Sequence, residues 1–72
     1  MDRALIVQHL AQAERHIASG QQRIERQRQI IGELECDGRD LATAKHLLAQ
    51  FEETQLLHIK DRDRLKKELV NV

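Results

Sequence analysis

The chain has 72 residues, with twelve Lys and Arg against twelve Asp and Glu, so its formal net charge is zero. A chain this short forms one small domain and encloses too little surface for a roomy active site, and its neutral charge argues against a dedicated nucleic-acid binder. Pro, Trp and Tyr are absent, and good helix formers make up most of the sequence. We therefore predict an all-α protein that is not an enzyme.

The first predicted helix covers about residues 2–36. One series of aliphatic residues recurs every seven positions, and it comprises Leu10, Ile17, Ile24 and Ile31. A second series at the same spacing comprises Ile6, Ala13, Gly20, Gln27 and Leu34. Together they form the a and d positions of a coiled-coil heptad, with the first series at a and the second at d.

Helix-breaking residues follow at residues 36–40, near the middle of the chain. Gly38 can adopt the left-handed conformation that ends a helix, and the Asp40 carboxylate can accept hydrogen bonds from the free amides that begin the next one. We therefore predict that the chain reverses over residues 37–40.

The second predicted helix covers about residues 40–70 and repeats the heptad pattern. Its a positions are Leu41, Leu48, Gln55, Arg62 and Leu69, and its d positions are Ala44, Phe51, His58 and Leu65. Because the turn lies between residues 34 and 41, folding the chain back places residue i opposite residue 75 − i. The long polar Gln55 and Arg62 then face the small Gly20 and Ala13, so we expect both to cross the interface and reach water. The whole chain, residues 1–72, is predicted to be one antiparallel two-helix hairpin.

Further apolar residues lie outside the a and d positions, at the b and e positions that follow them directly. The candidate dimer face comprises Val7, Ala11, Ala18, Ala49, Leu56 and Ile59. An isolated helix pair rarely buries enough surface to offset the loss of chain entropy. We therefore predict a homodimer in which two hairpins form a four-helix bundle. The alternative is that the alanines serve helix propensity alone.

Histidines raise the question of a metal site. His16, His58 and Asp61 should converge near the middle of the hairpin, with His9 one heptad before His16. Metal sites in helical bundles normally use inward Glu residues and Glu-x-x-His pairs, and neither helix has such a pair. We therefore expect no metal, cofactor or catalytic residues, with His58 filling a core position instead.

Basic residues cluster in two segments, residues 23–28 and 60–67, but acidic residues interrupt both and no aromatic residue is interleaved for base stacking. We interpret these segments as solvated helix faces. The predicted function is a structural or protein-interaction module that self-associates and can dock a helical partner. The alternative is a nucleic-acid-associated or regulatory accessory protein that uses the Arg and Lys residues.

The sequence also bears on location. The longest purely apolar run, residues 4–7, is far shorter than the roughly 18 to 20 residues that cross a bilayer. The first residues lack the apolar stretch of a secretory signal, and the single Cys36 cannot form an internal disulfide. We expect a cytoplasmic protein that does not enter a membrane.

Several segments resemble a group of small helical-hairpin proteins from alphaproteobacteria, mainly rhizobia and their relatives. These segments extend over nearly the whole chain and comprise His9-Leu10, residues 13–17, residues 26–28, Leu34-Glu35, Asp37-Gly38, Asp40, Leu47-Leu48, Phe51-Glu52, His58 and Asp61-Arg62. Members of the group often carry an acid three residues after the Asp that opens the second helix, where this chain has Thr43, so its helix cap lacks that contact. The resemblance implies a bacterial, cytoplasmic origin, and it implies no particular activity.

Overall fold

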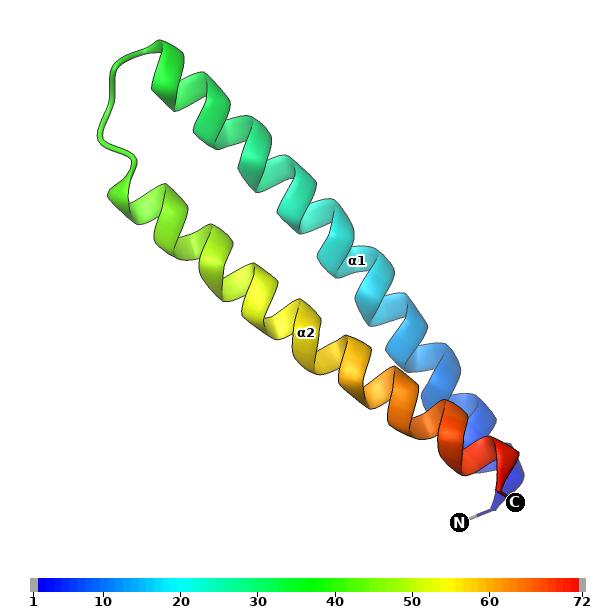
Figure 1. Cartoon of the computed structure of the whole chain (residues 1–72). Helices are drawn as coiled ribbons and strands as arrows, with labels where there is room; N and C mark the ends of the chain where they lie inside the picture. The colour runs from blue at the N-terminus through cyan, green and yellow to red at the C-terminus, as the bar shows by residue number, and fades with distance from the viewer. Residues whose placement is uncertain (1, 72) are drawn as a thin grey trace.

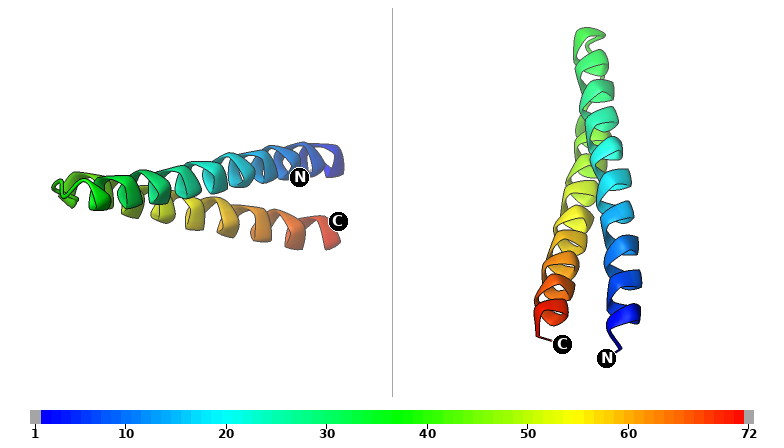
Figure 2. Two further views of the ribbon diagram at one scale, coloured as in Figure 1. Left: turned by 90° about the horizontal axis from the view of Figure 1, so that it is seen from above. Right: turned by 90° about the vertical axis from the view of Figure 1, so that its right-hand side faces the viewer.

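Residues 2–71 are described by a computed structural model, in which they form two long helices packed side by side in opposite directions (Figure 1). Helix α1 spans Arg3–Cys36 and helix α2 spans Ala42–Val70. The pair is a rod of 54 × 14 × 12 Å. The helices overlap near the termini in Figure 1 and near the turn in the right-hand view of Figure 2, so they wind around each other along the rod. The predicted all-α hairpin is confirmed.

The turn ends α1 with a Schellman motif. The backbone N–H of Arg39 donates to the carbonyl of Leu34, and that of Gly38 donates to the carbonyl of Glu35, both at 3.1 Å. This pattern requires a residue in the left-handed region, and Gly38 has φ +68°. The conformation predicted for Gly38 is therefore confirmed, and the last carbonyls of α1 are satisfied.

Aspartate side chains satisfy backbone amides at the start of both helices. The Asp2 carboxylate accepts from the N–H of Ala4 at 3.4 Å, and the Asp40 carboxylate accepts from the N–H of Ala42 at 3.0 Å. Helix α2 begins at Ala42, slightly later than the predicted start near residue 40. The difference arises because Leu41 is the N-cap residue, without a side-chain hydrogen bond of its own, and Asp40, the residue before it, accepts from the first helical amide.

The heptad positions account for the core. Every a and d position of the two helices from Ile6 to Leu69 is buried or half-buried; the buried side chains are Ile6, Ala13, Ile24, Gln27, Gln55 and Leu65. Elsewhere in the described helices, only Ile30, Ile59 and Glu68 are half-buried. The predicted heptad assignment is therefore confirmed in both helices.

A buried glutamine fixes the register near the turn. The Nε2 of Gln27 donates to the backbone carbonyl of Ala44 at 2.9 Å. In an α-helix a carbonyl points toward the residue four positions later, so this oxygen lies beside Leu48. Leu48 is the residue that the 75 − i rule places opposite Gln27, and the hydrogen bond supports that register.

Gln55 differs from its prediction. The 75 − i rule places Gln55 opposite Gly20, and the structure agrees. A Cβ added to Gly20 would come 2.9 Å from Cδ of Gln55 and would overlap its Oε1. However, Gln55 does not reach water: it is 7% exposed, and its Nε2 donates to the carbonyl of Ile17 at 2.8 Å. The expectation of a solvated amide was wrong, because the missing Cβ of Gly20 brings the α1 backbone within hydrogen-bond reach.

Arg62, the second long polar residue, follows its prediction. It is half-buried, and its guanidinium reaches the surface, where it pairs with the exposed Asp63 at 3.0 Å. A long aliphatic stem can cover the core while its charged end stays in water.

Neither described helix contains an apolar stretch long enough to cross a membrane.

Candidate functional site

The hairpin has two different edges, one along the e positions and one along the g positions. Arg28 and Glu52, both at e positions, form an ion pair of 3.5 Å between the helices, so the e positions of α1 and α2 adjoin. On the opposite edge, His9 and His16 of α1 and Asp61 of α2, all at g positions, line one shared hollow. We call these the e edge and the g edge.

The candidate dimer face lies beside the e edge. We call it the side face; it comprises Val7, Ala11, Ala18, Ala49, Leu56 and Ile59. All of these residues are exposed except Ile59, which is half-buried. Val7 is 48% exposed and Leu56 is 57% exposed, so two large apolar side chains remain accessible to water here. Because b and e positions share one side of a helix, the side face is continuous with the edge marked by Arg28 and Glu52.

The g edge brings together two of the predicted histidines. The rings of His16 and His58 stack with their centroids 4.9 Å apart and their planes at 24°. Asp61 lines the same hollow, as predicted, but its carboxylate accepts a hydrogen bond from Arg64 at 2.6 Å. Within residues 2–71, no three His, Cys, Asp or Glu side chains are placed to hold one metal ion. The histidines therefore contact each other across the two helices.

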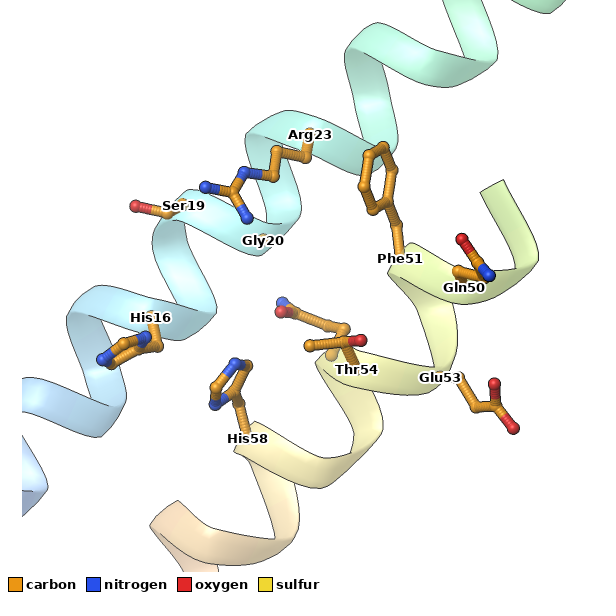
Figure 3. A pocket seen from close by; sticks show the side chains of 10 residues that line it. His16, Ser19, Gly20, Arg23, Gln50, Phe51, Glu53, Thr54 and His58 are labelled. Carbon is orange, nitrogen blue, oxygen red and sulfur yellow. The ribbon is translucent and has the colours of Figure 1, made fainter. Parts of the chain in front are cut away.

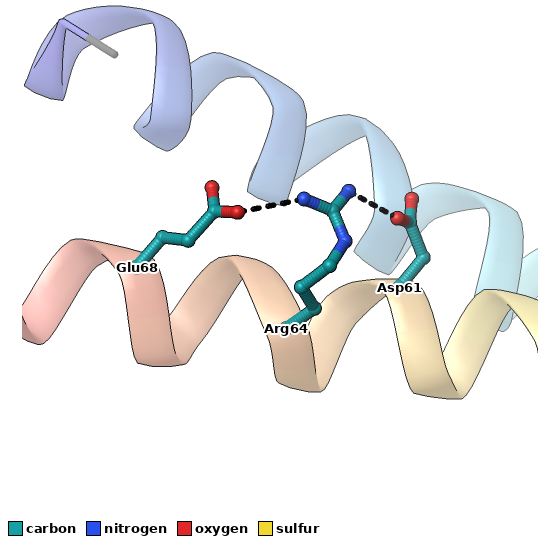
Figure 4. A network of polar contacts seen from close by, with 3 residues as sticks. All are labelled: Asp61, Arg64 and Glu68. Atoms are coloured by element: carbon teal, nitrogen blue, oxygen red, sulfur yellow. Dashed lines mark hydrogen bonds and ion pairs between the residues drawn. The ribbon is translucent and has the colours of Figure 1, made fainter.

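A chain of ion pairs runs along the outside of α2. Arg64 donates to Asp61 at 2.6 Å and to Glu68 at 2.8 Å, one turn away on either side (Figure 4). The hydrogen bonds that Arg64 donates to Asp61 and Glu68 raise its pKa above the ordinary value. Arg64 and Asp61 are exposed and Glu68 is half-buried, so these ion pairs are accessible to water and contribute little to stability.

The two basic segments are partly neutralised by such pairs. Arg28 pairs with Glu52 across the helices, Arg62 pairs with Asp63, and Arg64 is held as described above. Arg23, in contrast, forms no ion pair with any residue of the described chain. The basic segments are therefore mixed-charge surfaces, in which Arg26, Lys60, Lys66 and Lys67 likewise form no ion pair within the described chain.

A groove of about 620 Å³ opens on the g edge near the middle of the rod, and sequence reasoning did not foresee it (Figure 3). Its lining includes Ser19 and Arg23 from α1 and Phe51, Thr54 and His58 from α2. The heptad pattern contained a signal for the groove, because these lining residues occupy c, d and g positions, which border one edge of the hairpin. Only the register shows that they lie at the same level.

Comparison of the chain with protein-family models, with curated proteins and with solved structures finds no match. The function proposed below therefore depends on the residues and geometry of the hairpin itself.

Proposed function

We propose that the chain is a non-catalytic structural or interaction module, a hairpin that pairs with a second copy through the side face to form a four-helix bundle. The same kind of surface can dock a helix of another protein. The exposure of Val7 and Leu56 beside the e edge is the observation that carries this proposal. Pairing would remove both side chains from water, which contributes roughly 25 cal/mol per Å² of apolar surface buried.

The core of a single hairpin is small. Its buried apolar side chains within residues 2–71 are Ile6, Ala13, Ile24 and Leu65, and the other buried positions hold Gln27 and Gln55. Ordering each residue costs roughly 1 to 2 kcal/mol of backbone entropy, so an isolated hairpin of this kind is marginal. A second copy would give each helix a second apolar contact.

The b positions of the two helices are complementary in size. Under the observed register, the b positions that lie at about the same level are Ala4 with Val70, Ala11 with Asp63, Ala18 with Leu56, Glu25 with Ala49, and Gly32 with Ala42. Every pair contains Ala or Gly, and no pair joins two charges. The small residue in each pair permits close helix packing at each level.

A two-fold axis parallel to the helices would make use of this complementarity. It lays α1 of each copy on α2 of the other at the same level, so that Ala18 meets the partner's Leu56 near the middle of the rod. The arrangement also gives a reason for Gly32, since a Cβ there would meet nothing within 4 Å in its own hairpin. A close-packed partner helix would occupy that open space.

A nucleic-acid accessory role is less well supported. Binding to a phosphate backbone needs cations that are free to release counterions. Arg28, Arg62 and Arg64 are already paired with carboxylates, and acidic residues interrupt both basic segments, although five other cations of these segments form no ion pair within the described chain. We therefore favour the protein-interaction module.

The cellular location is inferred from Cys36 and from the resemblance to small bacterial hairpin proteins. Cys36 is free and exposed at the end of α1. Exposed free thiols persist in reducing compartments. We therefore propose that the module works in the bacterial cytoplasm.

Charge placed on the side face tests the proposal. Leu56→Glu combined with Ile59→Glu should give monomers of reduced helicity, because two carboxylates cannot be buried unpaired in the dimer. Arg15→Glu combined with Gln22→Glu adds the same residues at exposed positions outside the side face and is the matched control. Circular dichroism melts over a range of protein concentrations should show a concentration-dependent melting temperature for the original and control proteins only. Unchanged assembly in the Leu56 and Ile59 variant would contradict the proposal.

A further inference from the structure

The groove on the g edge has a polar wall and an apolar wall. In Figure 3 the rings of His16 and His58 face each other between the helices, whereas Arg23 lies farther along α1, with its guanidinium directed back toward Ser19, and Phe51 lies on α2. Thr54 lies between His58 and Phe51 along the same side of α2. Phe51 and His58 are half-buried and the other three residues are exposed, so the lining is accessible from solvent.

The polar wall carries several hydrogen-bond donors beside one unpartnered buried acceptor, the Oε1 of Gln55. Arg23 contributes a guanidinium with no carboxylate partner in the described chain, and imidazole N–H groups come from His16 and His58. Glu53 is the one acidic residue of the lining, and its side chain points away from the groove in Figure 3. Asp61, one turn beyond His58, is held by Arg64. The groove therefore presents donors and positive charge without a competing internal anion.

We propose that this groove binds a small organic phosphate monoester. The guanidinium of Arg23 would donate two parallel hydrogen bonds to two phosphate oxygens, the bidentate geometry that these groups prefer. His16 and His58 would donate to the remaining oxygens, with the hydroxyl of Thr54 at the rim. The volume of about 620 Å³ exceeds the size of one phosphate and lies in the range of small-molecule sites. Phe51 offers an apolar surface for the organic part of the ligand.

This site is separate from the proposed dimer face. The groove lies on the g edge, and the side face adjoins the e edge, which Arg28 and Glu52 mark on the other side of the rod. Ligand binding therefore leaves the side face free, and each property can fail without the other.

The four histidine rings provide the assay. The intact protein is titrated with inorganic phosphate and with phenyl phosphate at constant ionic strength and neutral pH, and the ring resonances are followed by NMR. We expect the rings of His16 and His58 to shift with saturation, whereas His46, which does not line the groove, should stay unchanged. Phenyl phosphate should bind more tightly than inorganic phosphate, because only it can cover Phe51.

Paired arginine variants test the proposed contact. Arg23→Gln should weaken phenyl phosphate binding by about tenfold, the loss expected for a charge-assisted hydrogen bond. Arg26→Gln removes an exposed arginine on the same helix outside the groove, and it should keep the original affinity within about twofold. Far-UV circular dichroism of both variants verifies that the hairpin stays folded.

Four results would overturn the proposal. One is the absence of shifts at His16 and His58, and another is equal weakening by the Arg23 and Arg26 variants, which would indicate nonspecific charge attraction. The third concerns ligand class: benzoate presents a carboxylate on the same ring, and it should bind more weakly than phenyl phosphate. Equal or tighter binding of benzoate, or equal binding of inorganic and phenyl phosphate, would contradict a phosphate monoester as the ligand.

Discussion

Adding a single methyl group at Gly20 probes the contact between α1 and the Gln55 side chain of α2. The Cβ introduced by Gly20→Ala would lie 2.9 Å from Cδ of Gln55 and overlap its Oε1. The Gln55 amide must then move away from Gly20, and its hydrogen bond to the carbonyl of Ile17 at 2.8 Å is lost. The backbone need not move, because the overlapping atoms are the end of a flexible side chain.

Two opposing effects decide the stability of this variant. Replacing Gly by Ala within a helix stabilises by about 1 kcal/mol through helix propensity. Leaving the buried Gln55 donor without its partner costs about 1 to 3 kcal/mol. We therefore expect Gly20→Ala to lower the free energy of unfolding by about 1 kcal/mol, although alanine is the better helix former.

A double-mutant cycle separates the two effects. In a Gln55→Ala background the overlap and the hydrogen bond are both absent, so Gly20→Ala should stabilise by about 1 kcal/mol. The free energies of unfolding come from urea titrations at one fixed protein concentration. A coupling energy of about 1 to 3 kcal/mol supports the contact. If Gly20→Ala stabilises equally in both backgrounds, Gln55 does not fill the space beside Gly20.

Two further predictions concern the turn and the dimer. Gly38→Ala should destabilise by about 1 kcal/mol, because a Cβ strains the left-handed conformation at φ +68°; an unchanged urea midpoint would contradict the Schellman turn. Mixing a variant carrying Ala18→Cys with one carrying Leu56→Cys, both without the native cysteine, should give a disulfide-linked heterodimer on oxidation. Preferential linking of Ala18→Cys to itself would instead indicate a two-fold axis perpendicular to the helices.

Much of the fold follows from the sequence because heptad spacing and turn chemistry are local signals. The recurrence of residues such as Ile17 and Ile24 predicts the buried stripe, and Gly38 predicts the reversal. Matching the two stripes across the turn then predicts that Gly20 faces Gln55. The destination of the Gln55 amide was not predictable, because it depends on how closely the α1 backbone approaches once a Cβ is missing.

The groove is harder to derive from the sequence. Arg23 belongs to a segment that its neighbouring acids mark as a solvated face, whereas the structure leaves Arg23 unpaired within residues 2–71. Its neighbours Thr54 and His58 are remote in sequence, and only the three-dimensional register brings them to the same edge. The His16–His58 contact was foreseen as a convergence, but the stacking of the rings depends on rotamers that spacing does not specify.

Self-association through the side face is the central claim, and sedimentation equilibrium of the unmodified protein tests it most directly. At tens of micromolar we expect a single species with twice the 8.4 kDa mass of the chain, dissociating on dilution with a parallel loss of helicity. A stable, fully helical monomer of 8.4 kDa at that concentration would contradict the four-helix bundle. Val7, Leu56 and the alanines beside them would then be exposed helix formers without an interface.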